Sequence, residues 1–287
     1  AASCGWSQTQ SQEGLPVELV IADEPPYAEQ LVTMRALYET AKEAQPKGGI
    51  INGLRSMFSG REKANYAPVA DLVKHAPRLR GELVETEGIY EAREERGVLR
   101  SMGAEILVEL MGGVQPQGFE ATEGRLDGMP VQVRGRVETE GDRALLRAEA
   151  IAPSALVAGL RVARILELQE DWAAAADAYE EVAKLRALAS RPLMPFARIR
   201  GGMIALQYLE DKARARAQFS AAWQPYSVQE HGQPLYFTWV PVAGDGWEKQ
   251  PVSEALAPRL DRLNSETVAY KVVDVFVRMA GGSTALG

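Results

Sequence analysis

Hydrophobic and polar residues alternate along the middle of the chain. A period of two places successive side chains on opposite faces of a strand, so each such segment has one apolar and one polar face. Glycines stand at 88 and 135, inside two of the segments, where a small barrel has to bend. The pattern predicts a five-stranded, closed or nearly closed barrel, with strands at 83–92, 104–110, 118–126, 131–138 and 144–151.

Helical spacing dominates on both sides of this region. Before it, we expect a short strand at 17–21, a helix that begins after Pro26, and a short helix that ends before Pro77. After Pro153 the chain becomes rich in alanine, and its apolar residues recur every three or four positions. Two further helices are expected near the end of the chain, at 255–263 and 267–279.

The alanine-rich part contains an internal repeat. Segments 160–185 and 196–223 each hold an acidic turn, Glu170-Asp171 and Glu210-Asp211, between two helical runs. Aligning the two turns pairs a small, an aromatic and a small residue in each second helix: Ala175, Tyr179 and Val182 with Ala215, Phe219 and Ala222. This signature resembles the tetratricopeptide repeat, although the turns are 40 residues apart rather than about 34. The resemblance implies stacked helix pairs whose concave face binds a peptide or helix of a partner.

Two stretches of the barrel region, 77–92 and 131–153, resemble the opening and closing strands of an OB-fold. Such barrels often bind single-stranded nucleic acid through a basic groove with stacking aromatic rings. Residues 78–152 contain 10 Arg and Lys against 15 Asp and Glu, and their only aromatic residues are Tyr90 and Phe119. The charge therefore favours a structural or protein-binding barrel over a nucleic-acid site.

Composition argues against most enzyme classes. The 287 residues carry a net charge of −7, one cysteine (Cys4) and two histidines, His75 and His231. One cysteine excludes an internal disulfide framework, and the sequence lacks nucleotide-binding, nucleophile-elbow, zinc-protease and haem-attachment motifs. We therefore expect no catalytic residue, no cofactor and no metal, and a chain that is not an enzyme. No window of 18 residues is apolar throughout, so no transmembrane segment is expected.

Candidate protein-binding residues come from three places in the sequence. Basic residues of the first helices in the repeat would line its concave face, and Trp6 would anchor the polar N-terminal tail on a neighbour. The aromatic stretch after the repeat supplies either the hydrophobic cap of the last repeat or further anchors. The candidates are Trp6, Arg161, Arg164, Arg198, Arg200, Tyr236, Trp239 and Trp247.

These observations predict an α+β multidomain protein, with a small OB-like barrel followed by a TPR-like helical region. The predicted parts are a tail, strand and helix (1–65), the barrel (66–153), the repeats (154–226), and an aromatic arm with capping helices (227–287). The function expected is that of a non-catalytic scaffold or accessory subunit, which binds other proteins in a larger and possibly membrane-associated complex. The alternative is an exported protein that binds or converts a small molecule at the barrel mouth, through Glu105, Glu109, Arg134 and Arg136.

The first residues bear on the compartment. The small residues Ala1, Ala2 and Ser3 before Cys4 are typical of the region around a bacterial signal cleavage site. A periplasmic or other extracytoplasmic location is therefore expected. Lipidation of Cys4, peripheral membrane association and a cytoplasmic origin stay open.

Overall fold

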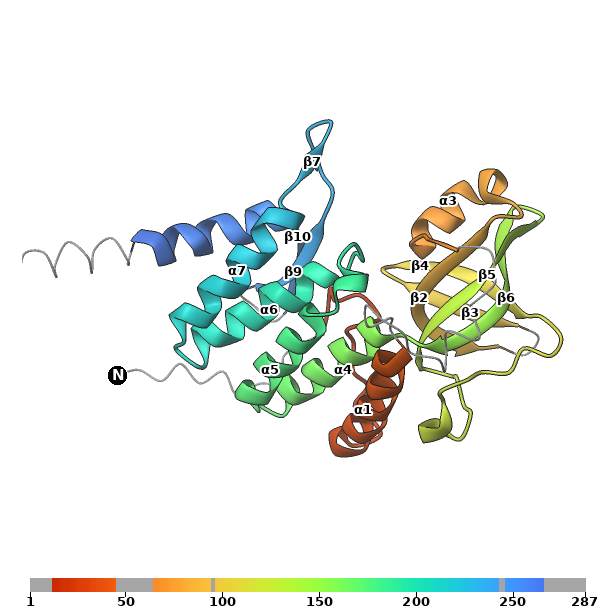
Figure 1. The fold of residues 1–287 in the computed structure, drawn as a ribbon, viewed down its shortest axis with the longest axis horizontal. Helices are drawn as coiled ribbons and strands as arrows, with labels where there is room; N and C mark the ends of the chain where they lie inside the picture. The colour runs from red at the N-terminus through yellow and green to blue at the C-terminus, as the bar shows by residue number, and fades with distance from the viewer. Residues whose placement is uncertain (1–11, 45–63, 94–95, 243–245, 266–287) are drawn as a thin grey trace, which may run out of the picture.

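The computed structural model describes residues 12–44, 64–93, 96–242 and 246–265. It has an α+β fold, with a β-barrel at one end and a set of helices at the other (Figure 1). Trp6, Cys4 and the helix expected at 267–279 lie outside the described residues. The predicted boundaries between the four parts of the chain stay predictions.

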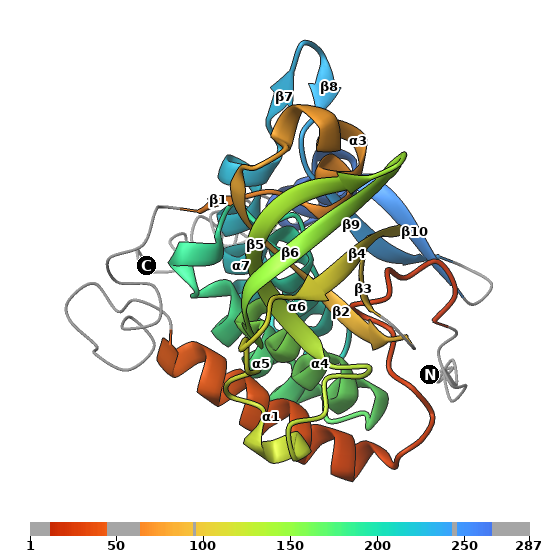
Figure 2. The same cartoon turned by 90° about the vertical axis from the view of Figure 1, so that its right-hand side faces the viewer.

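Five strands form the closed barrel: β2 (Leu83–Ala92), β3 (Gly97–Ser101), β4 (Ala104–Leu110), β5 (Pro130–Glu140) and β6 (Arg143–Pro153). Their spatial order is β2-β3-β4-β6-β5, and β5 pairs with β2 to close the ring. The β4–β6 pair is parallel, and the other pairs within the ring are antiparallel (Figure 2). A short strand, β1 (Asn65–Tyr66), runs parallel to the start of β2, and helix α3 (Val69–Leu79) packs against the barrel.

Glycines permit the sharp bends in two barrel strands. A Cβ on Gly88 would lie 2.3 Å from the carbonyl oxygen of Arg100, and one on Gly135 would lie 2.2 Å from that of Arg147. The ladder between β5 and β6 also shifts register between Arg134 and Gly135. The prediction that these glycines mark bends of a small barrel is consistent with this close backbone approach. Apolar side chains fill the interior, among them Leu99, Ile106, Val108, Val131, Val133 and Leu146.

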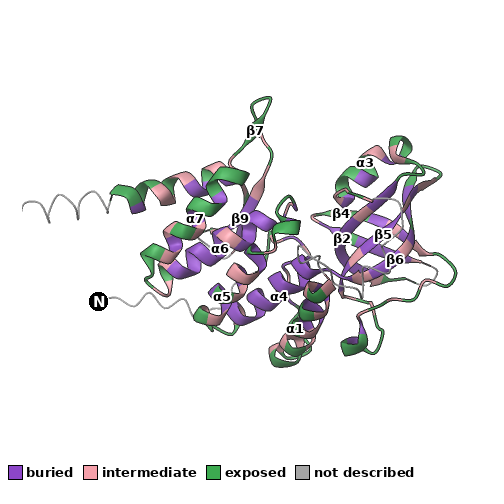
Figure 3. Ribbon diagram, viewed as in Figure 1, coloured by how far each residue is buried: buried purple, intermediate pink, exposed green. Residues whose placement is uncertain are grey.

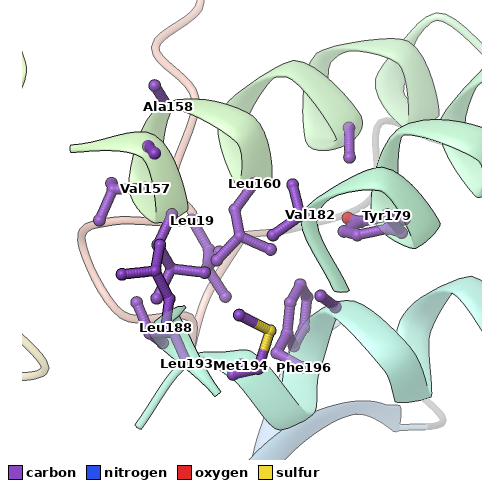
Figure 4. Close-up of a cluster of buried hydrophobic side chains, with 14 of the residues drawn as sticks. Leu19, Val157, Ala158, Leu160, Tyr179, Val182, Leu188, Leu193, Met194 and Phe196 are labelled. Atoms are coloured by element: carbon purple, nitrogen blue, oxygen red, sulfur yellow. The ribbon is translucent and has the colours of Figure 1, made fainter. Parts of the chain in front are cut away.

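Two expectations about strands were wrong. Residues 118–126 form a loop with one 3-10 turn at Glu120–Thr122. The remaining barrel strand is β3, which was not expected because its apolar residues do not alternate with polar ones. Residues 17–21 form turns and coil rather than a strand, with Leu19 packed on α4 and the Glu18 carboxylate bonded to the turn between β3 and β4 (Figure 4). Helix α3 consists of two helical pieces joined across His75, whose backbone is non-helical, so the first piece ends before Pro77 as expected and a second, short piece follows to Leu79.

The helices pack side by side in the order of the chain. They are α1 (Tyr27–Ala44), α4 (Ala155–Leu168), α5 (Trp172–Ala183), α6 (Met194–Gln207) and α7 (Lys212–Tyr226). Each packs against the next in this series, and β9 (Phe237–Val242) of the β9–β10 hairpin packs against α6. The partner strand is β10 (Gly246–Pro251), and residues 252–265 continue as a helix, as expected for 255–263. The small hairpin of β7 (Gln229–Glu230) and β8 (Gln233–Pro234) projects from this end in both views (Figures 1 and 2).

The two acidic turns have the same local geometry. Glu170 and Glu210 adopt left-handed backbone conformations, with φ of 59° and 54°. The side chains of Asp171 and Asp211 then cap the following helices, accepting hydrogen bonds from the amides of Ala174 (3.2 Å) and Arg214 (2.9 Å). The small–aromatic–small residues that the alignment paired are all buried in α5 and α7. The helices therefore contain an internal repeat of two helix pairs.

Buried apolar side chains form one continuous cluster through barrel and helices (Figure 3). Ser154, whose hydroxyl caps α4 through the amide of Val157, marks the passage from β6 into the helices. Leu19 lies inside the helical part of this cluster, close to Val157 and Leu160 of α4 (Figure 4). This contact brings the N-terminal residues onto the helices.

Candidate functional site

One side of α4 and α6 forms a continuous surface, which we call the inner face. On α4 it consists of Val157, Leu160, Arg161 and Arg164, which follow the i, i+3, i+4, i+7 spacing of one helix face. On α6 it consists of Phe196 and Arg200, one turn apart. The TPR-like prediction assigned arginines of these two helices to a binding groove.

Residues 12–21, called the N-terminal segment below, cover the α4 half of the inner face. Leu19 is fully buried there and lies among apolar residues of α4 and of the region before α6 (Figure 4). The side-chain amide of Gln12 closes the segment into a loop, since it both donates to the carbonyl of Ile21 and accepts from its amide, each at 2.7 Å. The segment is thus an irregular peptide seated on a helix face.

Arg161 holds this peptide by its main chain. Its Nε donates to the carbonyl of Glu18 and its Nη2 to that of Val17, both at 3.2 Å, while its Nη1 donates to Gly128 of the barrel at 3.3 Å. Burial lowers the pKa of Arg161 to about 10, and the Glu18 carboxylate opposes this decrease. The guanidinium is therefore charged at neutral pH, and it recognises backbone oxygens whatever side chains they carry.

Glu18 connects the same peptide to the barrel. Its carboxylate accepts hydrogen bonds from the Ser101 hydroxyl at 2.5 Å and from the Met102 amide at 3.0 Å. Burial raises the pKa of Glu18, whereas these hydrogen bonds and the charge of Arg161 act in the opposite direction. The N-terminal segment is therefore fixed from two sides, by α4 and by the turn between β3 and β4.

Trp247 of β10 covers the other half of the inner face. The guanidinium carbons of Arg164 and Arg200 lie 4.9 Å and 5.0 Å from the centre of the Trp247 ring. The ring of Phe196 packs against the same ring, with 5.9 Å between the two ring centres. The amide of Trp247 also donates to the carbonyl of Glu13 at 2.9 Å. The hairpin and the N-terminal segment therefore meet on the inner face.

A buried charge network lies beneath Trp247. Glu167 forms ion pairs with Arg164 at 2.6 Å and with Arg200 at 2.5 Å, and it accepts a hydrogen bond from the Tyr179 hydroxyl at 2.9 Å. Burial by itself would raise the pKa of Glu167, but the two arginine charges outweigh it and lower the pKa to about 2. The carboxylate is ionised at neutral pH, and it compensates two guanidinium groups inside the helical part.

The structure unites four of the candidate residues and separates the others. Arg161, Arg164, Arg200 and Trp247 belong to the inner face or its cover, but Arg164 and Arg200 are buried, so neither presents its charge to the outside. Their predicted contact with a partner stays a prediction.

The remaining candidates lie elsewhere. Arg198 donates to the carbonyl of Ala183 at 2.8 Å and so joins α6 to the end of α5. Tyr236 packs edge-on against Tyr226, and Trp239 is buried in β9. These contacts fit a hydrophobic cap, and a role in partner binding stays a prediction for each residue.

Sequence reasoning missed Glu18, Leu19 and Glu167. The only signal was a charged residue within an apolar run, as Glu18 is in VELVI. Buried charges need partners, so such a residue indicates a contact that the local pattern does not supply. The partner of Glu18, however, is more than 80 positions away.

The residues predicted for a barrel mouth do not share one site. Glu105 and Glu109 pair with Arg93 and Arg147 on the outer face, and Arg136 pairs with Glu149 there. Arg134 is buried under the helices. Apolar side chains fill the inside of the barrel, and a small-molecule site at its mouth stays an untested alternative.

A cavity of about 600 Å³ adjoins the N-terminal segment. It lies between this segment, α1 and the loop at 121–129, and Arg161, Met34, Ile89 and Met129 are part of its wall. Most of the wall is apolar, with polar groups at a few points. The cavity offers room for apolar side chains beside the peptide that Arg161 holds.

No known family model matches the chain, and no curated protein matches it. Within the described ranges, no helix is both long and apolar enough to cross a membrane. The same part of the chain contains no group of three or more His, Cys, Asp or Glu side chains placed to hold a metal ion.

Proposed function

We propose that this chain is a non-catalytic protein-binding subunit of a larger assembly, with a TPR-like helical region and an OB-like barrel. Its binding surface is the inner face, where Arg161 recognises the main chain of an irregular peptide and an apolar pocket takes one large side chain. The compartment we propose is extracytoplasmic.

Several observations support the TPR-like part of the proposal. The two helix pairs share the left-handed Glu, the capping Asp and the buried small–aromatic–small face. Close helix contact depends on glycine, because a Cβ on Gly202 would lie 2.5 Å from the ring of Phe219. Helix α1 packs on α4 at one end of the pairs, as a capping helix of a short repeat array does.

The barrel supports the proposal through its topology and charge. A ring of five strands in which the third and fifth run parallel is consistent with an OB-like Greek key. Acidic residues outnumber basic ones in it, which argues against a nucleic-acid surface. A barrel that instead anchors a peptide segment, through Ser101 and Met102, suits a protein-binding subunit.

The observation that carries the proposal is the seated N-terminal segment itself. Two guanidinium hydrogen bonds to main-chain oxygens of the segment and one buried leucine are means by which helical repeats can hold an irregular peptide. Recognition of this type does not depend on catalysis, and it is transferable to a peptide of another chain that brings a similar apolar anchor.

A peptide-exchange experiment tests whether the inner face is a binding site. A protease recognition sequence is inserted between Asp23 and Glu24, which are exposed, and the purified full chain is cleaved there. A fluorescent peptide of residues 12–22 should then bind the cleaved protein and not the intact one. The matched control peptide with Leu19→Asp should bind at least about 100-fold more weakly. Equal binding to intact and cleaved protein, or by both peptides, would show that the face is not such a site.

Membership of an assembly is tested separately. The chain is gently extracted from its natural source, separated by size and analysed by mass spectrometry for chains that migrate with it. Co-migration in a particle well above 31.3 kDa that persists through a second separation is expected. A single chain near 31.3 kDa would refute the subunit proposal.

A further inference from the structure

The cavity of about 600 Å³ that adjoins the N-terminal segment has the dimensions of a small-molecule site. Such sites measure roughly 300–1,000 Å³, and a water-sized group fills about 30 Å³ in a liquid, so this cavity has room for about 20 non-hydrogen atoms. Met34 of α1 and Ile89 of β2 line it and are buried, so they belong to its floor. The exposed wall residues mark its mouth, and they are Ala22, Glu24, Pro25, Ala121, Arg125 and Asp127.

Polar groups of the wall are already bonded within the chain. The Thr122 hydroxyl donates to a carbonyl of its own loop at 2.7 Å. The side-chain amide of Gln30 donates to the carbonyl of Ala22 at 2.9 Å, and the carboxylate of Asp127 accepts from the amide of Ala92 at 2.8 Å. A wall of this kind leaves few polar partners for water inside the cavity, and water without partners is easily displaced.

The charges of the wall balance. Glu24 and Asp127 contribute two negative charges, and Arg125 and Arg161 contribute two positive ones, so their formal sum is zero. The guanidinium of Arg161 also donates to three main-chain carbonyls. A charged ligand would lose hydration on entering and gain no net attraction from these four groups. A neutral apolar ligand gains from leaving water and loses little.

The N-terminal segment forms one side of this cavity. Val17 and Val20 line it and are only half-buried, so contact with a ligand would remove more apolar surface of the segment from water. The other sides belong to α1, the barrel and the loop at 121–129, from which the segment separates when it detaches. A ligand that contacts both sides binds the seated segment more tightly than the detached one, and it therefore stabilises the seated state.

We propose that this cavity binds a neutral, apolar small molecule of about 20 non-hydrogen atoms, and that the bound molecule holds the N-terminal segment on the inner face. The ligand and an apolar side chain of a partner exclude each other in the cavity. The proposal does not depend on the proposed protein-binding function, because both ligand binding and the seating of the segment are measured on the chain alone.

A pair of fluorescent probes with one carbon skeleton tests the ligand class. N-phenyl-1-naphthylamine is neutral, and 1-anilinonaphthalene-8-sulfonate is the same molecule with an added sulfonate. Both become brighter in apolar surroundings, so each is titrated against the full chain. The neutral probe should bind at micromolar concentration and at least about tenfold more tightly than the sulfonate, because the wall offers no net charge to replace the hydration of the anion.

A cavity-filling variant locates the site without removing a charge. Thr33→Phe, at a half-buried wall position of α1, should weaken binding of the neutral probe at least about tenfold while circular dichroism stays that of the unaltered chain. The matched control is Ala28→Phe, which adds the same ring at an exposed position of α1 that does not line the cavity. It should bind the probe as the unaltered chain does. If Thr33→Phe does not fold, Ala121→Phe in the loop serves the same purpose.

Hydrogen exchange measures whether the ligand holds the segment. The amide of Ile21 is bonded to the Gln12 side chain, and it exchanges when the segment detaches. With the neutral probe free at about ten times its dissociation constant, this amide should exchange roughly tenfold more slowly than without probe. In Thr33→Phe the same probe concentration should change its exchange little.

Four results would overturn the proposal. Absence of binding at micromolar concentration, or unchanged binding in a folded cavity-filling variant, would contradict the site. Equal or tighter binding of the sulfonate would contradict the ligand class. Unchanged exchange at Ile21 with the probe bound would contradict the link to the N-terminal segment.

Discussion

Replacing Leu19 by alanine tests how the N-terminal segment is attached. Leu19 has no exposed surface and lies against α4 and the residues before α6 (Figure 4). Removing such a side chain destabilises a protein by about 2–5 kcal/mol when the surroundings cannot collapse. Because the segment pairs with no strand in the described part of the chain, we expect the change to appear as local opening rather than global unfolding. A loss of about 3 kcal/mol increases the opening equilibrium roughly 100-fold.

Native-state hydrogen exchange measures this opening at two amides. The amide of Ile21 is bonded to the Gln12 side chain, and that of Trp247 is bonded to the Glu13 carbonyl, so both lose a partner when the segment detaches. In Leu19→Ala both should exchange roughly 100-fold faster, while the amide of Val133 in the barrel should not change. The control Leu235→Ala, at a side chain 49% exposed, should leave all three unchanged. Equal acceleration at Val133 and Ile21 would refute the idea of a separately attached segment.

Three other changes probe the buried charges, the barrel and the repeat. The pKa of Glu167 falls from 4.5 to about 2 on folding, so its contribution, on the order of 3 kcal/mol, is present above pH 4.5 and is lost as the pH falls towards 2. Urea unfolding of Glu167→Gln should show a lower stability at pH 7 and a smaller loss between pH 4.5 and 2, and an unchanged slope would contradict the assignment. Gly135→Ala brings a Cβ within 2.2 Å of a carbonyl oxygen and should destabilise the protein by about 1–3 kcal/mol, whereas Gly112→Ala, which meets nothing within 4 Å, should differ by less than about 0.5 kcal/mol. Asp171→Ala and Asp211→Ala should each lower the free energy of unfolding by about 1 kcal/mol, and the two losses should add in the double variant. Strong non-additivity would argue against two equivalent caps.

The sequence predicted those parts of the fold whose determinants are local. The Glu-Asp turns are recognisable in the sequence as a pair of acidic residues between two helical runs, and their geometry depends only on the next few residues. Gly88 and Gly135 mark bends because no other residue tolerates a carbonyl at that distance. The sequence pattern did not predict strand β3, because the consecutive residues Val98 and Leu99 are both buried and its apolar residues therefore do not alternate with polar ones.

The site was less accessible to sequence reasoning because its contacts are long-range. Helical spacing placed Arg161 and Arg164 on one face, but spacing does not reveal what covers that face. The cover comes from residues 12–21 and from Trp247, which lie more than 80 positions away on either side. The apolar run at 17–21 fits a strand pattern equally well, and only its turn and coil conformation in the structure identifies it as an irregular peptide.

If the inner face binds a partner as proposed, the tethered segment also limits what kind of partner it can take. The N-terminal segment is attached by the short connection at 22–26. It therefore competes with any free peptide for the inner face at an effective concentration in the millimolar range. If Leu19 alone contributes about 3 kcal/mol, the face is open in roughly 1% of molecules, and a free peptide binds about 100-fold more weakly than its intrinsic affinity. A partner overcomes this only by making further contacts, for which the neighbouring cavity of about 600 Å³ and the barrel surface are available. Under the proposed function, we therefore expect a lasting contact within an assembly rather than transient capture of soluble peptides.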